Sequence, residues 1–252
     1  MRPVDVTIVV NGHREGLLAP PSLRSVDLAV HRLSSEGAFA ETIAVLDRPD
    51  ALTLEVFTAW AASRQDLTLL QVDHGDLGKS RNAGVSAARG EWVAFLDADD
   101  LWGETWLSSA YFAAEKETRR SVWHPETNLY FGERPHIFTH IDMDDPEFSP
   151  AILALTNPWT ALCFAKRSLL LEVPYSPTAH QRQIGYEDWG WNMATIDRGA
   201  IHKIVPRTAH AIRTKSVSLL NQTTAAACLP QASTLLRNIL AKRSREESNC
   251  KP

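Results

Sequence analysis

The amino-acid sequence predicts an α/β protein built on a mostly parallel central sheet with helices on both faces. Over the first hundred residues, short apolar runs alternate with segments whose apolar residues recur at helical spacing. This alternation is typical of successive βα units. The 252 residues are 44% hydrophobic and 22% charged, which is enough apolar material to bury a sizeable core.

Four strands and three helices are expected in the first hundred residues, in strict alternation. The strands are Val4–Val10, Thr42–Leu46, Leu67–Val72 and Trp92–Leu96, and the helices are Pro21–Ser34, Leu52–Ser63 and Lys79–Arg89. Leu23, Val26, Val30 and Leu33 fall on one face of the first helix, and Gly90 ends the third.

The second half has a less regular pattern. We expect a helix at Trp106–Thr118, strands with a turn at Gly132 between 121 and 142, and a loop at Asp144–Pro150. A strand at Thr160–Ala165 precedes a short helix from Lys166. A helix at Glu187–Arg198 ends at Gly199, and a terminal helix at Thr224–Arg245 is interrupted near Pro230. With no linker in view, residues 1–252 are expected to form a single domain.

Composition and charge exclude several functions. The net charge of −4 argues against nucleic-acid binding, because neutralising phosphates requires clustered cations. The three cysteines, Cys163, Cys228 and Cys250, form no CxxC pair, so neither a disulfide framework nor a structural zinc site is indicated. Val6–Val10 is too short for a signal peptide, and no stretch approaches the roughly 20 apolar residues of a membrane span. We therefore expect a cytoplasmic protein.

One basic segment allows a peripheral membrane contact. Arg237, Lys242, Arg243 and Arg245 lie on the expected C-terminal helix. They could touch an anionic membrane surface. A solvated helix face is favoured instead, because Glu246 and Glu247 follow directly.

Acidic residues follow most of the expected strands. Ligands of open α/β sheets bind outside the carboxyl ends of the strands. The residues at those ends are Asn11–His13, Asp47-Arg48, Asp73–Asp76 and Asp97–Asp100. Three of these four segments contain aspartate, and such an acidic rim suits a metal ion or ribose hydroxyls.

The strongest local motif is the pair Asp97 and Asp99 at the end of the fourth strand. Positions two apart in an extended chain point to the same side, so both carboxylates can reach one ligand. Their hard oxygen atoms suit Mg²⁺ or Mn²⁺. The alternative is a turn whose aspartate caps the next helix. The similar sequence Asp142-Met143-Asp144 is discounted, because Pro146 and a loop follow it.

The run Gly78–Trp102 resembles the motif block of family 2 glycosyltransferases, which have the GT-A fold. It contains Gly78-Lys79-Ser80-Arg81-Asn82-Ala83-Gly84 and Gly90-Glu91-Trp92-Val93-Ala94-Phe95-Leu96-Asp97-Ala98-Asp99-Asp100. Gly185–Trp189 is similar to the family's Glu-Asp motif at a helix start, and Thr160–Leu171 to the segment before it. The resemblance covers roughly residues 4–220. It implies a nucleotide-sugar-binding half at 1–102, an acceptor-side half at 103–220, and a C-terminal helix and tail at 221–252.

The resemblance implies an inverting transfer of one sugar from a nucleoside-diphosphate donor to an acceptor hydroxyl, dependent on Mn²⁺ or Mg²⁺. Asp188 is then the general base, with Glu187 beside it. Asn11, Asp47, Arg81 and Asp97 contact the nucleotide sugar, with Asp47 at the base. Asp99, assisted by Asp97, ligates the metal. Asp47 favours UDP or dTDP, because a carboxylate can accept the imide N–H of uracil or thymine.

Some features depart from the family. Asp47-Arg48-Pro49-Asp50 stands where the family usually has two adjacent aspartates followed by Gly-Ser. The Q-x-x-R-W motif of processive synthases is missing, which favours transfer of a single sugar. Two alternatives stay open: a sugar nucleotidyltransferase, although the glycine-rich loop it needs is missing after the first strand, and a non-catalytic nucleotide-sugar-binding protein.

A few other residues have two interpretations. Trp102, Trp159, Trp189 and Trp191 are expected in the core rather than as sugar platforms. His210 and Arg213 lie where some GT-A enzymes place a metal or phosphate ligand. For His210, packing within a strand is the favoured interpretation.

Overall fold

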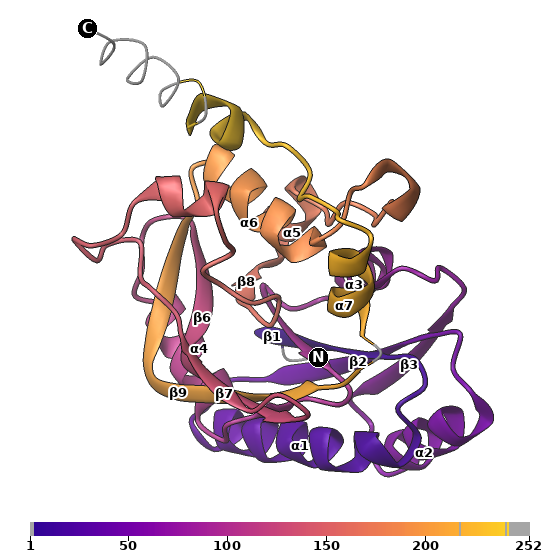
Figure 1. Cartoon of the computed structure of the whole chain (residues 1–252). Coiled ribbons are helices and arrows are strands. Elements are labelled where there is room, and N and C mark those ends of the chain that lie inside the picture. The colour runs from indigo at the N-terminus through magenta and orange to yellow at the C-terminus, as the bar shows by residue number, and fades with distance from the viewer. Residues whose placement is uncertain (1–2, 217, 240, 242–252) are drawn as a thin grey trace, which may run out of the picture.

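The computed structural model describes residues 3–216, 218–239 and 241. It is an α/β protein whose strands run in the order β3-β2-β1-β4-β8-β6-β9-β5, with β7 paired to β6 (Figure 1). The strands are β1 (Val6–Gly12), β2 (Ala40–Asp47), β3 (Leu67–Val72), β4 (Trp92–Asp97), β5 (Leu101–Trp102), β6 (Ser121–Gly132), β7 (His136–Thr139), β8 (Phe164–Lys166) and β9 (Ile201–Thr214).

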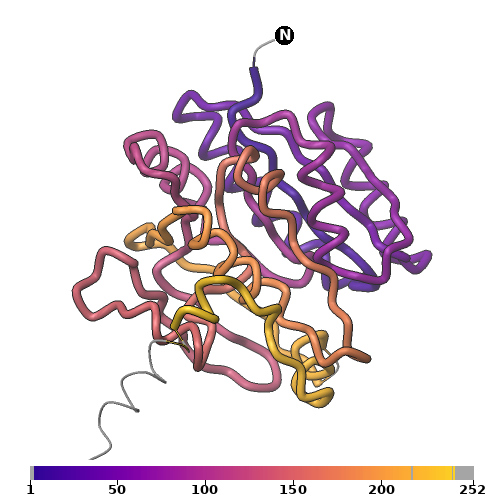
Figure 2. Tube along the Cα trace, turned by 90° about the horizontal axis from the view of Figure 1, so that it is seen from above, coloured from indigo at the N-terminus to yellow at the C-terminus, as the bar shows by residue number. Residues whose placement is uncertain are grey.

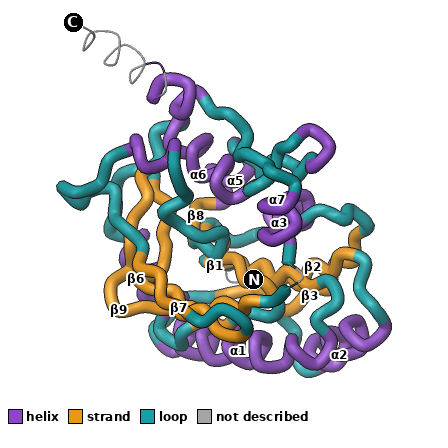
Figure 3. The backbone as a smooth tube through the Cα atoms, in the orientation of Figure 1, coloured by secondary structure: helices purple, strands orange, loops and turns teal. Residues whose placement is uncertain are grey.

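Helices cover both faces of the sheet (Figure 3). They are α1 (Ala19–Ser35), α2 (Ala51–Ala62), α3 (Leu77–Ala87), α4 (Trp106–Ala114), α5 (Arg167–Glu172), α6 (Glu187–Asp197) and α7 (Leu219–Ala225), with 3₁₀ turns at Gly16–Leu18, Pro150–Ala154 and His180–Arg182. Seen from above, the first hundred residues gather on one side and the later segments on the other (Figure 2).

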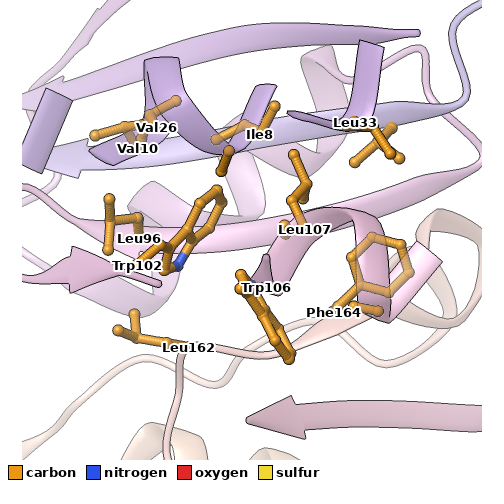
Figure 4. Packing of buried hydrophobic residues seen from close by; sticks show 14 of the residues in the cluster. Ile8, Val10, Val26, Leu33, Leu96, Trp102, Trp106, Leu107, Leu162 and Phe164 are labelled. Carbon is orange, nitrogen blue, oxygen red and sulfur yellow. The ribbon is translucent and has the colours of Figure 1, made fainter. Parts of the chain in front are cut away.

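The parallel strands β2, β1 and β4 are buried on both faces because their side chains alternate between two cores, whereas the edge strand β3 is only partly buried. Ile8 and Val10 pack with Val26 of α1 in one hydrophobic cluster, as Figure 4 shows. Val9, one residue out of phase, packs with Val85 of α3 in the other. This arrangement confirms the predicted fold class, including the helices on both faces.

The elements of the first hundred residues follow the order expected from the sequence, whereas the second half differs. Strand β5 was not expected, and the expectation gave no bounds for β9. The strand expected at Thr160–Ala165 is only Phe164–Lys166. The terminal helix expected at Thr224–Arg245 is instead α7, which begins at Leu219, followed by non-helical chain around Pro230 and helix again from residue 234. Lys242, Arg243 and Arg245 lie outside the described residues. Across the part of the chain that is described, every helix is too short or too polar to cross a bilayer.

Strand β9 lies between β6 and β5 in the sheet. It runs parallel to β6 and antiparallel to β5. Its register against β6 shifts at a bulge: Val205 lies opposite Pro125, whereas Ala209 lies opposite Thr127. Four steps along β9 therefore match two along β6. Arg207, within the bulge, has a left-handed backbone with φ of 60°.

Buried histidines lie between β6, β9 and the neighbouring loop. His124 and His202 hydrogen-bond each other at 2.9 Å between Nε2 and Nδ1, and both stack on Trp159. Burial lowers the pKa of His202 to about 3 and that of His140 to about 4. Burial also holds the pKa of His124 well below its ordinary value, with the neighbouring histidines adding to the effect.

We expect acid to destabilise the protein through these histidines. In the unfolded chain these histidines bind protons below a pH of about 6.5, whereas in the folded chain they stay neutral until the pH falls to their lower folded pKa. Stability is therefore retained above that pH, and each histidine removes about 1.4 kcal/mol per pH unit as the pH falls through the interval. Urea midpoints measured between pH 7.5 and 5 check this. His202→Asn should flatten the slope, while exposed His136→Gln should leave it unchanged.

Candidate active site

A cleft of about 1000 Å³ opens along the carboxyl ends of β1, β2 and β4 and extends to the start of α6. All seven residues predicted as site residues line it: Asn11, Asp47, Arg81, Asp97, Asp99, Glu187 and Asp188. The opposite wall comes from β6, the end of β9 and α7, through Tyr130, Arg213, Lys215 and residues 218–223. The structure thus brings the residues predicted for the donor and for the acceptor to one cleft, while their individual roles stay predictions.

Asp47 anchors a loop at the end of β2. Its carboxylate accepts the backbone N–H groups of His74, Gly75 and Asp76 at 2.9–3.1 Å and the Ser80 hydroxyl at 3.0 Å. Burial alone would raise the pKa of Asp47, but these four hydrogen bonds outweigh it and lower the pKa. Four donors match the acceptor capacity of a carboxylate. Contact with a nucleobase therefore requires one of these donors to leave, and it stays a prediction.

The departure from the family at Asp47-Arg48-Pro49-Asp50 has a visible consequence. Arg48 adopts a left-handed backbone with φ of 53° and pairs with Asp73. Gly75, also left-handed, lies so close to the Arg48 guanidinium that a Cβ at this position would approach Nη1 to 2.2 Å. In the loop after β2 the Arg48 guanidinium therefore lies against Gly75, and Asp50 caps α2 by accepting the N–H of Thr53.

Arg81 is the buried link between the two sides of the cleft. Its guanidinium contacts Asp97 at 3.1 Å and Glu187 at 3.0 Å, and its side chain is 1% exposed. Burial would lower the pKa of the Arg81 guanidinium, but Asp97 and Glu187 outweigh it and raise the pKa. The guanidinium also lies over the ring of Tyr175 at 5.4 Å. Arg81 is thus not a solvated helix charge, and its partners show how it fixes two carboxylates that are 90 residues apart in the chain.

Two cations of β9 and the loop after it hold Asp99. Arg213 Nη1 lies 3.0 Å and Lys215 Nζ 2.7 Å from the same oxygen, Oδ2. The adjacent Asp100 accepts the backbone N–H of Arg213 at 2.7 Å. Burial raises the pKa of Asp100 well above its ordinary value, with Asp97 and Asp99 adding to the effect. The acidic rim is therefore balanced by cations that arrive from the opposite end of the sequence.

The aspartates fit an open metal site that is completed by a substrate. Both cations of the Asp99 contact approach Oδ2, so Oδ1 accepts neither of them. Mg²⁺ is commonly bound by one or two carboxylates together with water and substrate phosphates. Over the described ranges, no three His, Cys, Asp or Glu side chains are grouped as metal ligands. A metal at Asp99 and Asp97 would therefore need the phosphate oxygens of a bound nucleotide.

Asp188 lies half-buried in the first turn of α6. Asn157 Nδ2 donates to its Oδ2 at 3.0 Å. Burial, with Glu187 adding to the effect, raises the pKa of Asp188 to about 7, although Arg81 opposes the rise. A carboxyl group with such a pKa is suited to accept a proton near neutral pH. Tyr186, with φ of 52°, makes the sharp turn that starts the helix and brings Asp188 to the cleft.

The structure separates the two residues for which a metal or phosphate contact was considered. His210 is buried, stacks on Trp102 at 6.3 Å and meets Trp106 edge-on at 4.7 Å, and it does not line the cleft. The position of His210 in β9 is therefore explained by its packing against Trp102 of β5 and Trp106 of α4. Arg213 does line the cleft. Trp102, Trp159 and Trp191 are core residues, as expected. Trp189 is partly buried and packs against the hydrophobic cluster that contains Trp159.

The discounted motif Asp142-Met143-Asp144 lies elsewhere. Lys203 contacts Asp142 and Asp144 at 2.7 Å each, and Arg119 also contacts Asp144 at 2.7 Å. None of these residues lines the cleft. The motif thus belongs to an ion-pair network outside the cleft.

The residues of the site that were not predicted from the sequence include Lys215, Asn157 and Tyr130. Lys215 could have been found by its spacing, because Arg213 and Lys215 are two apart at the end of a strand, as are Asp97 and Asp99. Asn157 and Tyr130 lie in segments whose local pattern gives no indication of the cleft.

Comparisons with known proteins agree with this geometry. A model of glycosyl transferase family 2 matches residues 22–167, more than half of the chain. The succinoglycan biosynthesis protein ExoO of Rhizobium meliloti (strain 1021) is 36% identical over 96 residues, which are 38% of this chain and 26% of that protein. The chain thus matches about a quarter of the length of that curated relative.

Solved structures share the fold. S. aureus TarS 1-349 in complex with UDP-GlcNAc has a TM-score of 0.67 and 15% identity, over 94% of this chain and 72% of that chain. The mannosyltransferase PcManGT from Pyrobaculum calidifontis, in complex with GDP-Man and Mn²⁺, has a TM-score of 0.63 and 16% identity, over 96% and 70%. The GT-A type fold that the motifs predicted is therefore confirmed, and the extent of the family match shows that the chain belongs to glycosyl transferase family 2.

Proposed function

We propose that the protein is an inverting glycosyltransferase that moves one sugar from a nucleoside-diphosphate donor to a carbohydrate or other hydroxyl acceptor. The observation that carries the proposal is the division of one cleft into two carboxylate sites. Asp97 and Asp99, with cations beside them, suit the diphosphate, whereas half-buried Asp188 suits the acceptor. Direct displacement at the anomeric carbon needs both sites, on opposite sides of the reacting sugar.

The donor side stabilises the leaving group. A nucleoside diphosphate gains negative charge as the glycosidic bond breaks, and Arg213 and Lys215 supply two cations at this end of the cleft. When bound through Asp99 and Asp97, a divalent metal adds Lewis-acid neutralisation of the same charge. Asn11 has a buried side-chain amide whose nitrogen and oxygen have no partner within the described structure. A donor that hydrogen-bonds this amide would relieve the cost of leaving it unpaired.

The acceptor side removes a proton. Asp188 takes it from the acceptor hydroxyl as the oxygen attacks the anomeric carbon, and the diphosphate leaves from the other face with the bonding electrons. A single displacement inverts the configuration at that carbon. Glu187 acts beside the base by holding Arg81, which in turn fixes Asp97.

Metal dependence is tested by chelation. Because Asp97 and Asp99 present oxygen ligands at the donor end, sugar transfer is expected to stop in excess EDTA and to return with Mn²⁺ or Mg²⁺. Asp99→Asn should weaken metal-dependent binding of the nucleoside diphosphate, as measured by calorimetry. Asp142→Asn, in the ion-pair network outside the cleft, is the matched control and should leave that binding unchanged. Full activity in EDTA would mean that Arg213 and Lys215 neutralise the leaving group without a metal.

The donor base is tested by the same method. We propose UDP or dTDP, because the resemblance assigns the base to Asp47, whose carboxylate can accept the imide N–H of uracil or thymine once one of its four internal donors leaves. TarS bound to UDP-GlcNAc has a similar fold, and so has PcManGT bound to GDP-Man, so the fold itself accommodates either base. Titration calorimetry with UDP, dTDP and GDP should give the lowest Kd for UDP or dTDP. Preferential binding of GDP would contradict the assignment.

The proposal is distinguished from its rivals by the products. A glycosyltransferase releases a nucleoside diphosphate only when donor and acceptor are both present. A sugar nucleotidyltransferase would release pyrophosphate from a nucleoside triphosphate and a sugar phosphate. A non-catalytic binding protein would release neither product.

A further inference from the structure

Among the described residues, Asn157 is the one outside α6 whose side chain hydrogen-bonds Asp188. It lies in the loop before β8, 31 residues upstream of Asp188, and donates from Nδ2 to Oδ2 at 3.0 Å. Neither the general-base mechanism nor the family motifs require an amide at this position.

The orientation of the Asn157 amide is fixed by its other contacts. Its Oδ1 accepts from Asn192 Nδ2 at 3.0 Å and from the backbone N–H of Trp159 at 3.4 Å. Both partners are donors, so the oxygen must face them and the NH₂ group must face the carboxylate. Asn192 is four residues after Asp188, on the same face of α6. The helix that carries the base therefore also carries the residue that orients the amide bound to it.

The residues that hold the Asn157 amide are themselves held by the core of the protein. Asn192 is 1% exposed, and its backbone carbonyl accepts the hydroxyl of Thr195 at 2.7 Å. Thr195 is also 3.0 Å from Nε2 of the buried His202. Trp159 is buried against the same histidines. Asn157 is thus held by a rigid interior on one side and contacts Asp188 on the other.

We propose that Asn157 is a positioning residue for the general base, fixed by Asn192, and that it holds one oxygen of Asp188 so that the other takes the acceptor proton. The proposal rests on the role of Asp188 in the proposed function. A donor to a carboxylate stabilises its charged, proton-accepting form. It also fixes the rotation of the carboxyl group, which sets the direction of proton transfer.

The groups around Asp188 explain why a neutral amide suits this position. Glu187 lies beside it on α6, Arg81 faces it from α3, Tyr130 from β6, and Cys163 and Tyr175 from the neighbouring loops. Another acid here would add repulsion, and another cation would hold the carboxylate too strongly to accept a proton. An amide donates one hydrogen bond without adding charge.

Two variants test the proposal. Asn157→Ala and Asn157→Asp both remove the donor, and the aspartate keeps the size of the side chain. For both we expect kcat to fall about 10- to 100-fold. The KM for the donor and the Kd for the nucleoside diphosphate should be unchanged. The pH at which kcat is half-maximal should move upward, further for Asn157→Asp, whose added charge raises the pKa of Asp188 again.

A buried amide outside this contact is the control. Asn128 donates to Thr160 and faces His140. Asn128→Ala should lose stability without moving the pH profile. If Asn157→Asp keeps the wild-type kcat and pH profile and only the melting temperature changes, Asn157 is structural and the proposal is wrong.

A double-variant cycle separates this inference from the proposed function. If Asp188→Asn reduces transfer as expected, Asn157→Ala should have no further effect on the residual kcat in that background. A large loss for Asp188→Asn without a loss for Asn157→Ala would overturn the positioning role alone. Retained transfer in Asp188→Asn would instead overturn the base assignment on which it rests.

Discussion

Asp188→Asn is expected to reduce sugar transfer by a factor of about 10²–10⁴, the range typical of losing a general base. An amide cannot take the acceptor proton, so the loss falls on kcat. The Kd for the nucleoside diphosphate should barely change, because Asp188 is proposed to contact the acceptor rather than the nucleotide. In the wild type, kcat should rise as Asp188 loses its proton near a pH of about 7. The variant should lose this ascending limb.

A matched melting temperature is the control for Asp188→Asn, since the two side chains have nearly the same shape. Glu187→Gln should reduce kcat less, because Glu187 holds Arg81 rather than the acceptor. If Asp188 were only a charge near the N-terminus of α6, its replacement would cost about 0.3–1 kcal/mol of stability and leave transfer nearly intact. Transfer at the wild-type rate would therefore remove the catalytic assignment.

Arg81→Met is expected to lower the free energy of unfolding by about 3–5 kcal/mol. The methionine fills much of the volume, but it leaves Asp97 and Glu187 without their shared cation. The cost is large because the Arg81 and Glu187 side chains are buried, at 1% and 9% exposure. Urea denaturation followed by circular dichroism measures the change.

The control for Arg81→Met is an exposed arginine in an ion pair. Arg32 pairs with Glu36 one turn later on the surface, so Arg32→Met should cost about 0.3–0.5 kcal/mol at most. Removing one of the unpaired carboxylates should recover stability. The double variant Arg81→Met with Glu187→Gln should therefore lose less unfolding free energy than the two single variants lose in sum. Strict additivity would show that Arg81 does not couple these carboxylates.

The first half of the fold could be predicted from the sequence because each strand and helix has its own local pattern. Strand Leu67–Val72 agrees at both ends, and the alternation of Ile8 and Val9 between two cores follows from a strand buried on both faces. The position of Asp97 and Asp99 in the cleft could also be predicted, because they follow a parallel strand and the carboxyl ends of parallel strands meet at one edge of the sheet.

The second half of the fold could not be predicted in the same way, because it depends on contacts between residues far apart in the sequence. Nothing local indicates that Arg213 reaches Asp99 across 114 residues or that Arg81 reaches Glu187 across 106. The expected position of Arg81 near the nucleotide stays a prediction, but no pattern in the sequence indicated that its guanidinium is buried between two carboxylates. The internal donors that occupy Asp47 could not be seen either, because three of them are backbone N–H groups, which any sequence supplies.

The bulge between β6 and β9 has a consequence for where the cations lie. Before it, partners differ by 80 in number, and after it by 82, so Phe131 lies opposite Arg213. Had the earlier register continued, Ala211 would lie opposite Phe131, and Arg213 would run on by two residues, about 7 Å along the strand. Arg213 and Lys215 would then both lie beyond Asp99. The two extra residues of β9 act as a spacer that sets the reach of the strand, and the charge balance of the cleft depends on that length.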